Sequence, residues 1–132
     1  SIWGPEDDAT SLLLERLPIH GRWLDLACGD GRYLKTLLDR ADDVVAVDID
    51  PHVEAPLLRA HGVEKLSFRV MDATLPLPFP ELSFDGILCT GTLHLFDQAK
   101  LSFIISEAMR ILREGGIFVF DFFGGILVSN PS

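Results

Sequence analysis

Residues 23–34 read WLDLACGDGRYL, and this stretch decides the fold. An apolar run containing Asp25 is followed by a loop of small residues from Ala27 to Gly31, and then by a pattern typical of a helix. In parallel α/β sheets, a strand that passes into a helix through a glycine-rich loop commonly receives a ligand. Because Asp25 and Asp30 bring negative charge to this turn, the sequence points to a ligand other than a phosphate.

Length and charge restrict the class of protein. The chain has 132 residues, which is enough for one domain with a buried core and no metal or disulfide staples. Its net charge of −9 repels a phosphate backbone, which disfavours nucleic acid as a partner. No apolar run approaches the roughly 18 residues of a membrane span. The acidic residues 6–8 stand where a signal peptide needs a basic segment, and two cysteines fit a reducing compartment, so we expect a cytoplasmic protein.

Strand and helix patterns alternate along the chain. Apolar or β-branched runs predict strands over residues 22–26, 44–50, 66–70, 84–89 and 117–123. Amphipathic patterns predict helices over residues 7–17, 32–40, 53–61 and 97–113. Asp97 is expected to cap the last helix and Gly115-Gly116 to end it. This order predicts an α/β fold with a doubly wound, mainly parallel Rossmann-like sheet of about five strands.

The C-terminal residues leave two alternatives open. Gly124-Gly125 allows residues 126–128 to return as a short antiparallel strand along the edge of the fifth strand. Otherwise the chain is a fragment of a longer protein. In either case three residues cover only part of an apolar strand edge, which favours self-association through the fifth strand or pairing with a partner.

Polar or small residues follow four of the predicted strands. Asp25, Asp48 and Asp72 lie at or just past three strand ends, and Cys89-Thr90 lies at a fourth. Ligands of parallel sheets bind beyond the carboxyl ends of the strands, where the strand order reverses. We therefore expect these groups to face one crevice.

The residues of this crevice favour a nucleoside with a cationic arm. A dinucleotide-binding loop needs a third glycine where this chain has Leu34, and Asp25 suits an ammonium group better than a pyrophosphate. Asp48 is placed to accept hydrogen bonds from both ribose hydroxyls. Asp72 is placed to accept one from the exocyclic amine of adenine.

These residues carry a family resemblance. LDLACGDGR (24–32) resembles motif I of the class I S-adenosylmethionine-dependent methyltransferases, with Ala27 in place of the family's usual first glycine. VVAVDID (44–50) and VMDATLPLPF (70–79) are similar to the family's next two motifs. SFDGILCTGTLHLF (83–96) and EAMRILREGGIFVF (107–120) follow in the expected order, so the resemblance covers about residues 20–122. It implies transfer of the methyl group of S-adenosylmethionine to a small-molecule acceptor, with S-adenosylhomocysteine as product.

The resemblance also implies a cofactor site and one domain. A lid or helix over residues 1–20 precedes a core of residues 21–123 and a tail of residues 124–132. His94 is the candidate catalytic base, and no metal is expected, because a sulfonium is already an activated electrophile that needs mainly alignment and exclusion of water. The expected cofactor-binding residues are Asp25, Ala27, Cys28, Gly29, Gly31, Asp48, Ile49, Met71, Asp72, Ala73, Cys89 and Thr90.

Simpler structural interpretations stay open. The glycines can serve only a tight turn, Asp48 can cap a helix before Pro51, and Asp72 can cap the turn at Thr74. A lone histidine such as His94 is more often structural. Cys28 and Cys89 are either buried thiols or, as ends of neighbouring strands, a disulfide. Two other functions also remain: a methyltransferase-like binding module without turnover, and a nicotinamide-dependent oxidoreductase.

Overall fold

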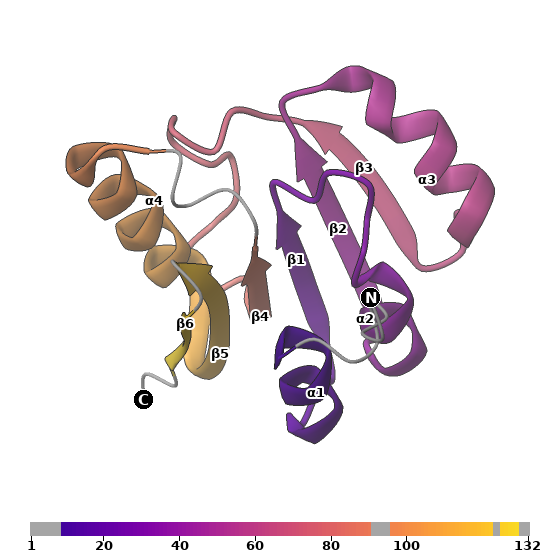
Figure 1. Ribbon diagram of the computed structural model, residues 1–132, viewed down its shortest axis with the longest axis horizontal. Helices are drawn as coiled ribbons and strands as arrows, with labels where there is room; N and C mark the ends of the chain where they lie inside the picture. Colours follow the sequence, from indigo (N-terminus) through magenta and orange to yellow (C-terminus); the bar gives the residue numbers. More distant parts are fainter. Residues whose placement is uncertain (1–8, 91–95, 123–124, 130–132) are drawn as a thin grey trace.

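The computed structural model describes residues 9–90, 96–122 and 125–129, and of residues 121–129 only the backbone. Six strands form one sheet in the order β3-β2-β1-β4-β5-β6 (Figure 1). The strands are β1 (Arg22–Leu26), β2 (Asp43–Asp48), β3 (Leu66–Val70), β4 (Phe84–Cys89), β5 (Leu112–Phe122) and β6 (Gly125–Ser129). The helices are α1 (Ala9–Arg16), α2 (Leu34–Arg40), α3 (Glu54–His61) and α4 (Gln98–Ile111), with a 3₁₀ turn, η2 (Pro51–Val53), before α3.

The first five strands are parallel, as the alternating pattern predicted. The bounds predicted for β1, β3 and β4 are confirmed. The chain adds β2 and β3 on one side of β1, then crosses to add β4 and β5 on the other side. The strand order therefore reverses between β1 and β4, and the crevice at their carboxyl ends is the expected ligand position.

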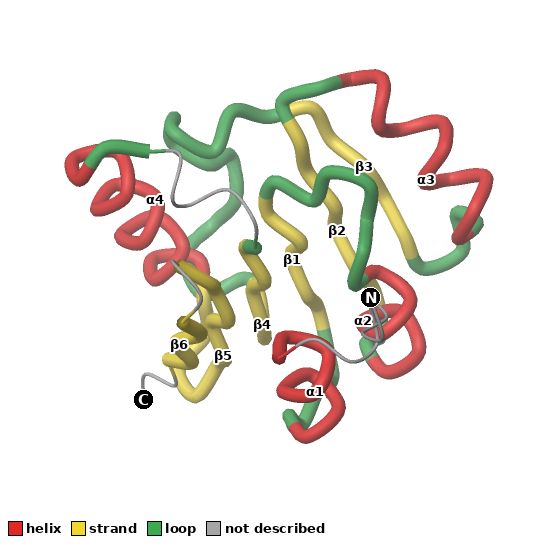
Figure 2. Tube along the Cα trace, viewed as in Figure 1, coloured by secondary structure: helices red, strands yellow, loops and turns green. Residues whose placement is uncertain are grey.

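Helices cover both faces of this sheet, so the doubly wound architecture is confirmed (Figure 2). Side chains alternate along β2: Val45 and Val47 join the core under α4, whereas Val44 and Ala46 join the core under α1, α2 and α3. All four side chains are buried, which explains why the strand reads as a continuous apolar run. In the described part of the chain, no helix is long and apolar enough to cross a membrane.

The predicted end of the last helix is wrong. Asp97 caps α4 as expected, but the helix ends at Ile111 and the chain is already extended at Leu112. Leu112 is buried and pairs with Phe84, and the register with β4 then shifts so that Gly86 pairs with Ile117. Gly115, at φ +76°, belongs to this irregularity within β5 and does not end the helix. Burial of Leu112 and its pairing with β4 decide where the helix stops.

The antiparallel return at the C-terminus is confirmed and is longer than predicted. The backbone of β6 pairs with β5 from Phe118↔Ser129 to Phe122↔Gly125. We expected this edge of β5 to be mostly open, but β6 pairs with it from Phe118 to Phe122. Self-association through the edge of β5 stays a prediction, and it requires that β6 be displaced.

Candidate functional site

The loops after β1 and β3 are both held against the end of β2. Beyond the last strand pairs, the Cys28 amide donates to the Val47 carbonyl at 2.9 Å, and the Met71 amide donates to the Asp48 carbonyl at 2.9 Å. These bonds continue the parallel ladder past the strands. They bring the loops that follow β1, β2 and β3 to the same edge of the sheet; Asp48 ends β2 and Asp72 lies in the loop after β3, whereas Asp25 lies within β1.

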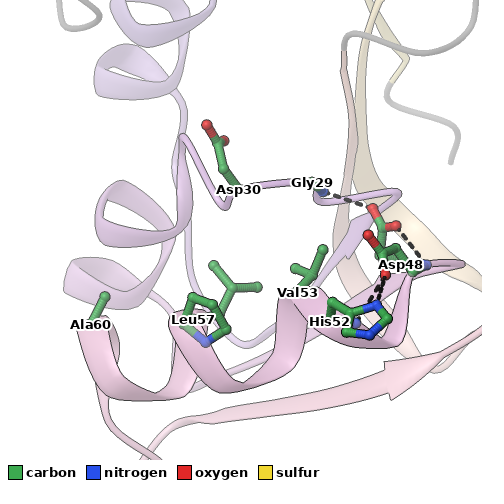
Figure 3. Close-up of a pocket in the computed structure, with 9 residues that line it drawn as sticks. Gly29, Asp30, Asp48, His52, Val53, Leu57 and Ala60 are labelled. Carbon is green, nitrogen blue, oxygen red and sulfur yellow. Dashed lines mark hydrogen bonds and ion pairs between the residues drawn. The ribbon is translucent and has the colours of Figure 1, made fainter.

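The Asp48 carboxylate joins two of these loops. Its Oδ2 accepts a hydrogen bond from the Gly29 amide at 2.8 Å, and its Oδ1 accepts one from the Asp50 amide at 3.0 Å (Figure 3). The helix-capping interpretation of Asp48 is wrong, because Asp50 caps η2 by accepting a bond from the His52 amide at 2.9 Å. Asp48 is therefore a fixed carboxylate between the glycine-rich loop and η2.

The two glycines of the loop have different roles. A Cβ on Gly31 would lie 2.5 Å from Leu57 Cδ2 and 2.8 Å from Leu34 Cδ1, so this glycine lets the loop pack closely on α2 and α3. A Cβ on Gly29 would meet nothing within 4 Å. The backbone of Gly29 therefore borders open space in which a ligand fits.

Ala27 stands in the left-handed region, at φ +58°. This conformation is strained for a residue with a Cβ and costs about 1–2 kcal/mol. The strain gives a physical reason for the glycine that the resembling motif has at this position.

Asp25 is a buried acid with no cation beside it among the residues that the structure describes. Its exposed fraction is 3%, and within the described residues no hydrogen-bond donor or positive group contacts its carboxyl. Burial, followed by the charges of Asp48 and Asp30, raises the pKa of Asp25 to about 8. The carboxyl is therefore protonated near neutral pH, and a cation placed beside it would favour the charged form.

Asp72 has a structural role and a free oxygen. Its Oδ1 accepts bonds from the Thr74 amide at 2.9 Å and from Thr74 Oγ1 at 2.6 Å, so the turn-capping interpretation is confirmed. These bonds lower the pKa of Asp72. Its Oδ2 has no donor in the part of the chain that the structure describes, so an ionised oxygen remains for a ligand.

A small cavity of about 240 Å³ brings together six of the predicted residues. Phe96, which sequence reasoning missed, completes its wall. The residue immediately precedes the Asp97 cap of α4, where an apolar side chain normally indicates helix packing. The lining residues are Ala27, Asp48, Ile49, Met71, Asp72, Ala73 and Phe96.

A larger cavity of about 600 Å³ lies between the glycine-rich loop and α3 (Figure 3). Its apolar side comes from residues 53, 56, 57 and 60, which the 3.6-residue period of a helix places on one face. Its polar lining consists of Asp30, Asp48, Asp50 and His52. Asp48 lines both cavities, so its carboxylate lies where they meet.

The remaining predicted residues lie elsewhere. Cys89 is 1% exposed and packs in the core under α4, whereas Cys28 is half-buried. Both are free thiols, so the buried-thiol interpretation is confirmed for Cys89, whereas Cys28 is a free thiol only partly buried, and desolvation raises its pKa. Thr90 follows β4 and is partly buried. His94 lies outside the described residues, and its catalytic role remains a prediction.

Comparisons with known proteins agree with this geometry. The methyltransferase domain family matches residues 24–120. An uncharacterized methyltransferase of Synechocystis is 35% identical, over 87% of this chain and 54% of that protein. The 27-O-demethylrifamycin SV methyltransferase of Amycolatopsis mediterranei is 30% identical, over 96% of this chain and 48% of that protein. The chain thus spans about half the length of these relatives.

Among solved structures, the DhpI–SAH complex superimposes with a TM-score of 0.74. It is 26% identical and covers 87% of this chain and 56% of that one.

We expect Ala27→Gly to stabilise the fold. The substitution removes the left-handed strain at Ala27, and the added freedom of the unfolded chain offsets part of the gain, which leaves about 0.5–1 kcal/mol. Urea unfolding measures the free energy. The control Ala55→Gly, on the exposed side of α3, should destabilise by roughly 0.5–1 kcal/mol. A loss of stability at both positions would contradict the strain at Ala27.

We expect Asp25→Asn to change how stability depends on pH. The folded carboxyl, with a pKa of about 8, keeps a proton that the unfolded chain releases near its ordinary pKa of 3.8. The free energy of unfolding of the wild type should therefore fall, relative to the variant, as pH rises from 4 to 8, by an amount on the order of a few kcal/mol. Urea unfolding of both proteins at pH 5, 6, 7 and 8 tests this. A difference that does not vary with pH would show that the Asp25 carboxyl has its ordinary pKa.

Proposed function

The chain belongs to the class I S-adenosylmethionine-dependent methyltransferases, and from this premise we propose that it binds S-adenosylmethionine across the ends of β1, β2 and β3 and transfers its methyl group to a small molecule. The observation that carries this proposal is that Asp48 and Asp72, from neighbouring strand ends, line one cavity, while Asp25 of β1 lies close enough to Asp48 for their charges to interact. Each offers a carboxyl suited to a different part of the cofactor.

The small cavity is the proposed site of adenine. Ile49, Met71 and Ala73 give it apolar walls that suit the faces of a purine. Ile49 is 64% exposed and lines the cavity, so its side chain is accessible to a ligand bound there. The free Oδ2 of Asp72 is the acceptor for the exocyclic amine.

Asp48 is the proposed ribose acceptor. Each of its oxygens accepts one backbone N–H, and an ionised carboxylate oxygen has capacity for a second donor. Two ribose hydroxyls therefore find one free acceptor position on each oxygen. Because the Gly29 and Asp50 amides already hold the carboxylate in place, little side-chain entropy is lost when the ribose binds.

Asp25 and the open space at Gly29 are the proposed site of the amino-acid arm. An ammonium group would supply the cation that the buried Asp25 carboxyl lacks among the described residues. A phosphate in the same place would add negative charge beside Asp25, Asp30 and Asp48. This balance favours a sulfonium nucleoside over a dinucleotide.

Bound S-adenosylmethionine supplies an already activated methyl group, so the residues of the chain mainly have to orient the two reactants and keep water out. Thr90 at the end of β4 stays a proposed cofactor-binding residue, and His94 beyond it is the residue we propose on the acceptor side, as base for an acceptor that must lose a proton. A small-molecule acceptor is supported by the relative named for 27-O-demethylrifamycin SV and by the net charge of −9, which disfavours nucleic acid. The free thiols support a reducing compartment, and we propose the cytoplasm.

Ligand affinity tests the proposed cofactor. By isothermal titration calorimetry, S-adenosylhomocysteine should bind more tightly than NAD. Asp48→Ala should weaken S-adenosylhomocysteine roughly ten- to a hundredfold, because charge-assisted hydrogen bonds worth about 1.5–3 kcal/mol are lost. Asp72→Ala should weaken it less, since a single hydrogen bond to an amine is at stake.

Asp39→Ala is the matched control, because it removes one carboxylate from the exposed outer side of α2. Its affinity should equal that of the wild type. Unchanged affinity in Asp48→Ala would exclude Asp48 as the ribose acceptor, and tighter binding of NAD would favour the oxidoreductase.

Methyl transfer is tested separately from binding. With radiolabelled S-adenosylmethionine and a panel of phenol, carboxylate and amine acceptors, we expect transfer that His94→Ala slows for acceptors that must lose a proton. The same variant should leave the affinity for S-adenosylhomocysteine unchanged. Tight binding with no transfer to any acceptor would support the binding module instead.

A further inference from the structure

We infer that Phe96 is the stacking residue for the nucleobase, and that it sets how tightly the base binds while Asp72 sets which base binds. This inference rests on the proposed function. It concerns a residue that lies on no predicted strand end and that was not among the expected cofactor-binding residues, although it ends the stretch 83–96. Three observations on the start of α4 carry it.

Phe96 is the aromatic residue in the wall of the small cavity. The other lining side chains are aliphatic or acidic or, in Met71, a thioether. Phe96, Met71 and Ala73 each pack against the core under α4, and each keeps part of its surface exposed. The ring therefore has one part anchored in the core and another part on the cavity.

The start of α4 and Asp72 border the same cavity, because Phe96 and Asp72 both line it. The charge of Lys100 contributes to lowering the pKa of Asp72, which places the two side chains within electrostatic reach. Phe96 and Lys100 flank the Asp97 cap. The start of α4 thus meets the cavity at the carboxylate proposed to accept the exocyclic amine.

The position of Phe96 is fixed by the helix start. Asp97 Oδ1 accepts a bond from the Lys100 amide at 2.9 Å, and the Asp97 carbonyl accepts one from the Leu101 amide at 2.9 Å. Phe96 and Leu101 occupy the two positions of a hydrophobic staple, and both pack on the same core. A ring held in this way stacks on a base with little loss of side-chain entropy.

Stacking and hydrogen bonding have different signatures. Every base has a π face, so stacking on an aromatic ring increases affinity with little regard to base identity. A carboxylate acceptor instead distinguishes a base that carries an amine from one that carries a carbonyl at the same position. A leucine at position 96 would keep the apolar contact with Leu101 that forms the staple, but it has no aromatic ring to stack on a base. The substitution therefore separates the two roles of Phe96.

The experiment titrates S-adenosylhomocysteine and S-inosylhomocysteine, which differ in the exocyclic group of the base and in the adjacent N1, an acceptor in adenine and a donor in hypoxanthine. The proteins are the wild type, Phe96→Leu, Phe96→Trp, Asp72→Asn and the control Phe103→Leu, which changes a partly exposed phenylalanine of α4 outside both cavity walls. Thermal midpoints verify that each variant is folded.

Phe96→Leu should weaken both ligands by a similar factor of roughly five to a hundred, the effect of losing one base–aromatic contact. Phe96→Trp should retain or increase affinity for both. Asp72→Asn should instead reduce the preference for the adenine ligand over the hypoxanthine ligand. Phe103→Leu should stay within about twofold of the wild type for both ligands.

Wild-type affinity in a folded Phe96→Leu protein would overturn the inference and leave the proposed function standing. A Phe96→Leu effect confined to one of the two ligands would also overturn it, because stacking acts on both bases. If neither ligand binds the wild type, the proposed function fails, and this inference fails with it.

Discussion

The hydrogen bond from the Gly29 amide to Asp48 Oδ2 is the contact on which the rest of the site depends. It joins the loop after β1 to the end of β2, and the bond from the Asp50 amide to the same carboxylate adds the start of η2. Asp48 lines both cavities, so a single side chain belongs to the wall of each. Asp48 therefore holds the glycine-rich loop and the start of η2 in place even in the absence of a ligand.

Two features near the glycine-rich loop lower the stability of the free protein. Ala27 adopts a left-handed conformation, and Asp25 is an acid with an exposed fraction of 3%. Both features are unfavourable in the free protein. A bound cation would stabilise the buried Asp25 carboxylate. Ligand binding would therefore offset the free energy that burial of Asp25 costs in the free protein. Local instability of this kind is common where a protein must bind a charged group.

The strands that lead to this edge of the sheet are packed between two buried cores. Side chains of β2 alternate between two buried cores, and α4 contributes to one of them through Ile104, Ala108 and Ile111. The same helix begins at the small cavity, where Phe96 precedes its cap. A helix whose body is locked into the core thus holds its first turn rigidly at the site.

The sequence by itself determined the parallel sheet and the edge at which Asp25, Asp48 and Asp72 meet. Continuous apolar runs mark the strands and a 3.6-residue period marks the helices, and the carboxyl ends of parallel strands share one edge. Only the tertiary structure decided where α4 ends, because the burial of Leu112 and its pairing with Phe84 override the glycine signal that follows. It also decided that Asp50 caps η2 while Asp48 binds Gly29, and that Phe96 borders a cavity. These outcomes depend on which segments far apart in the chain come into contact, and local patterns do not contain that information.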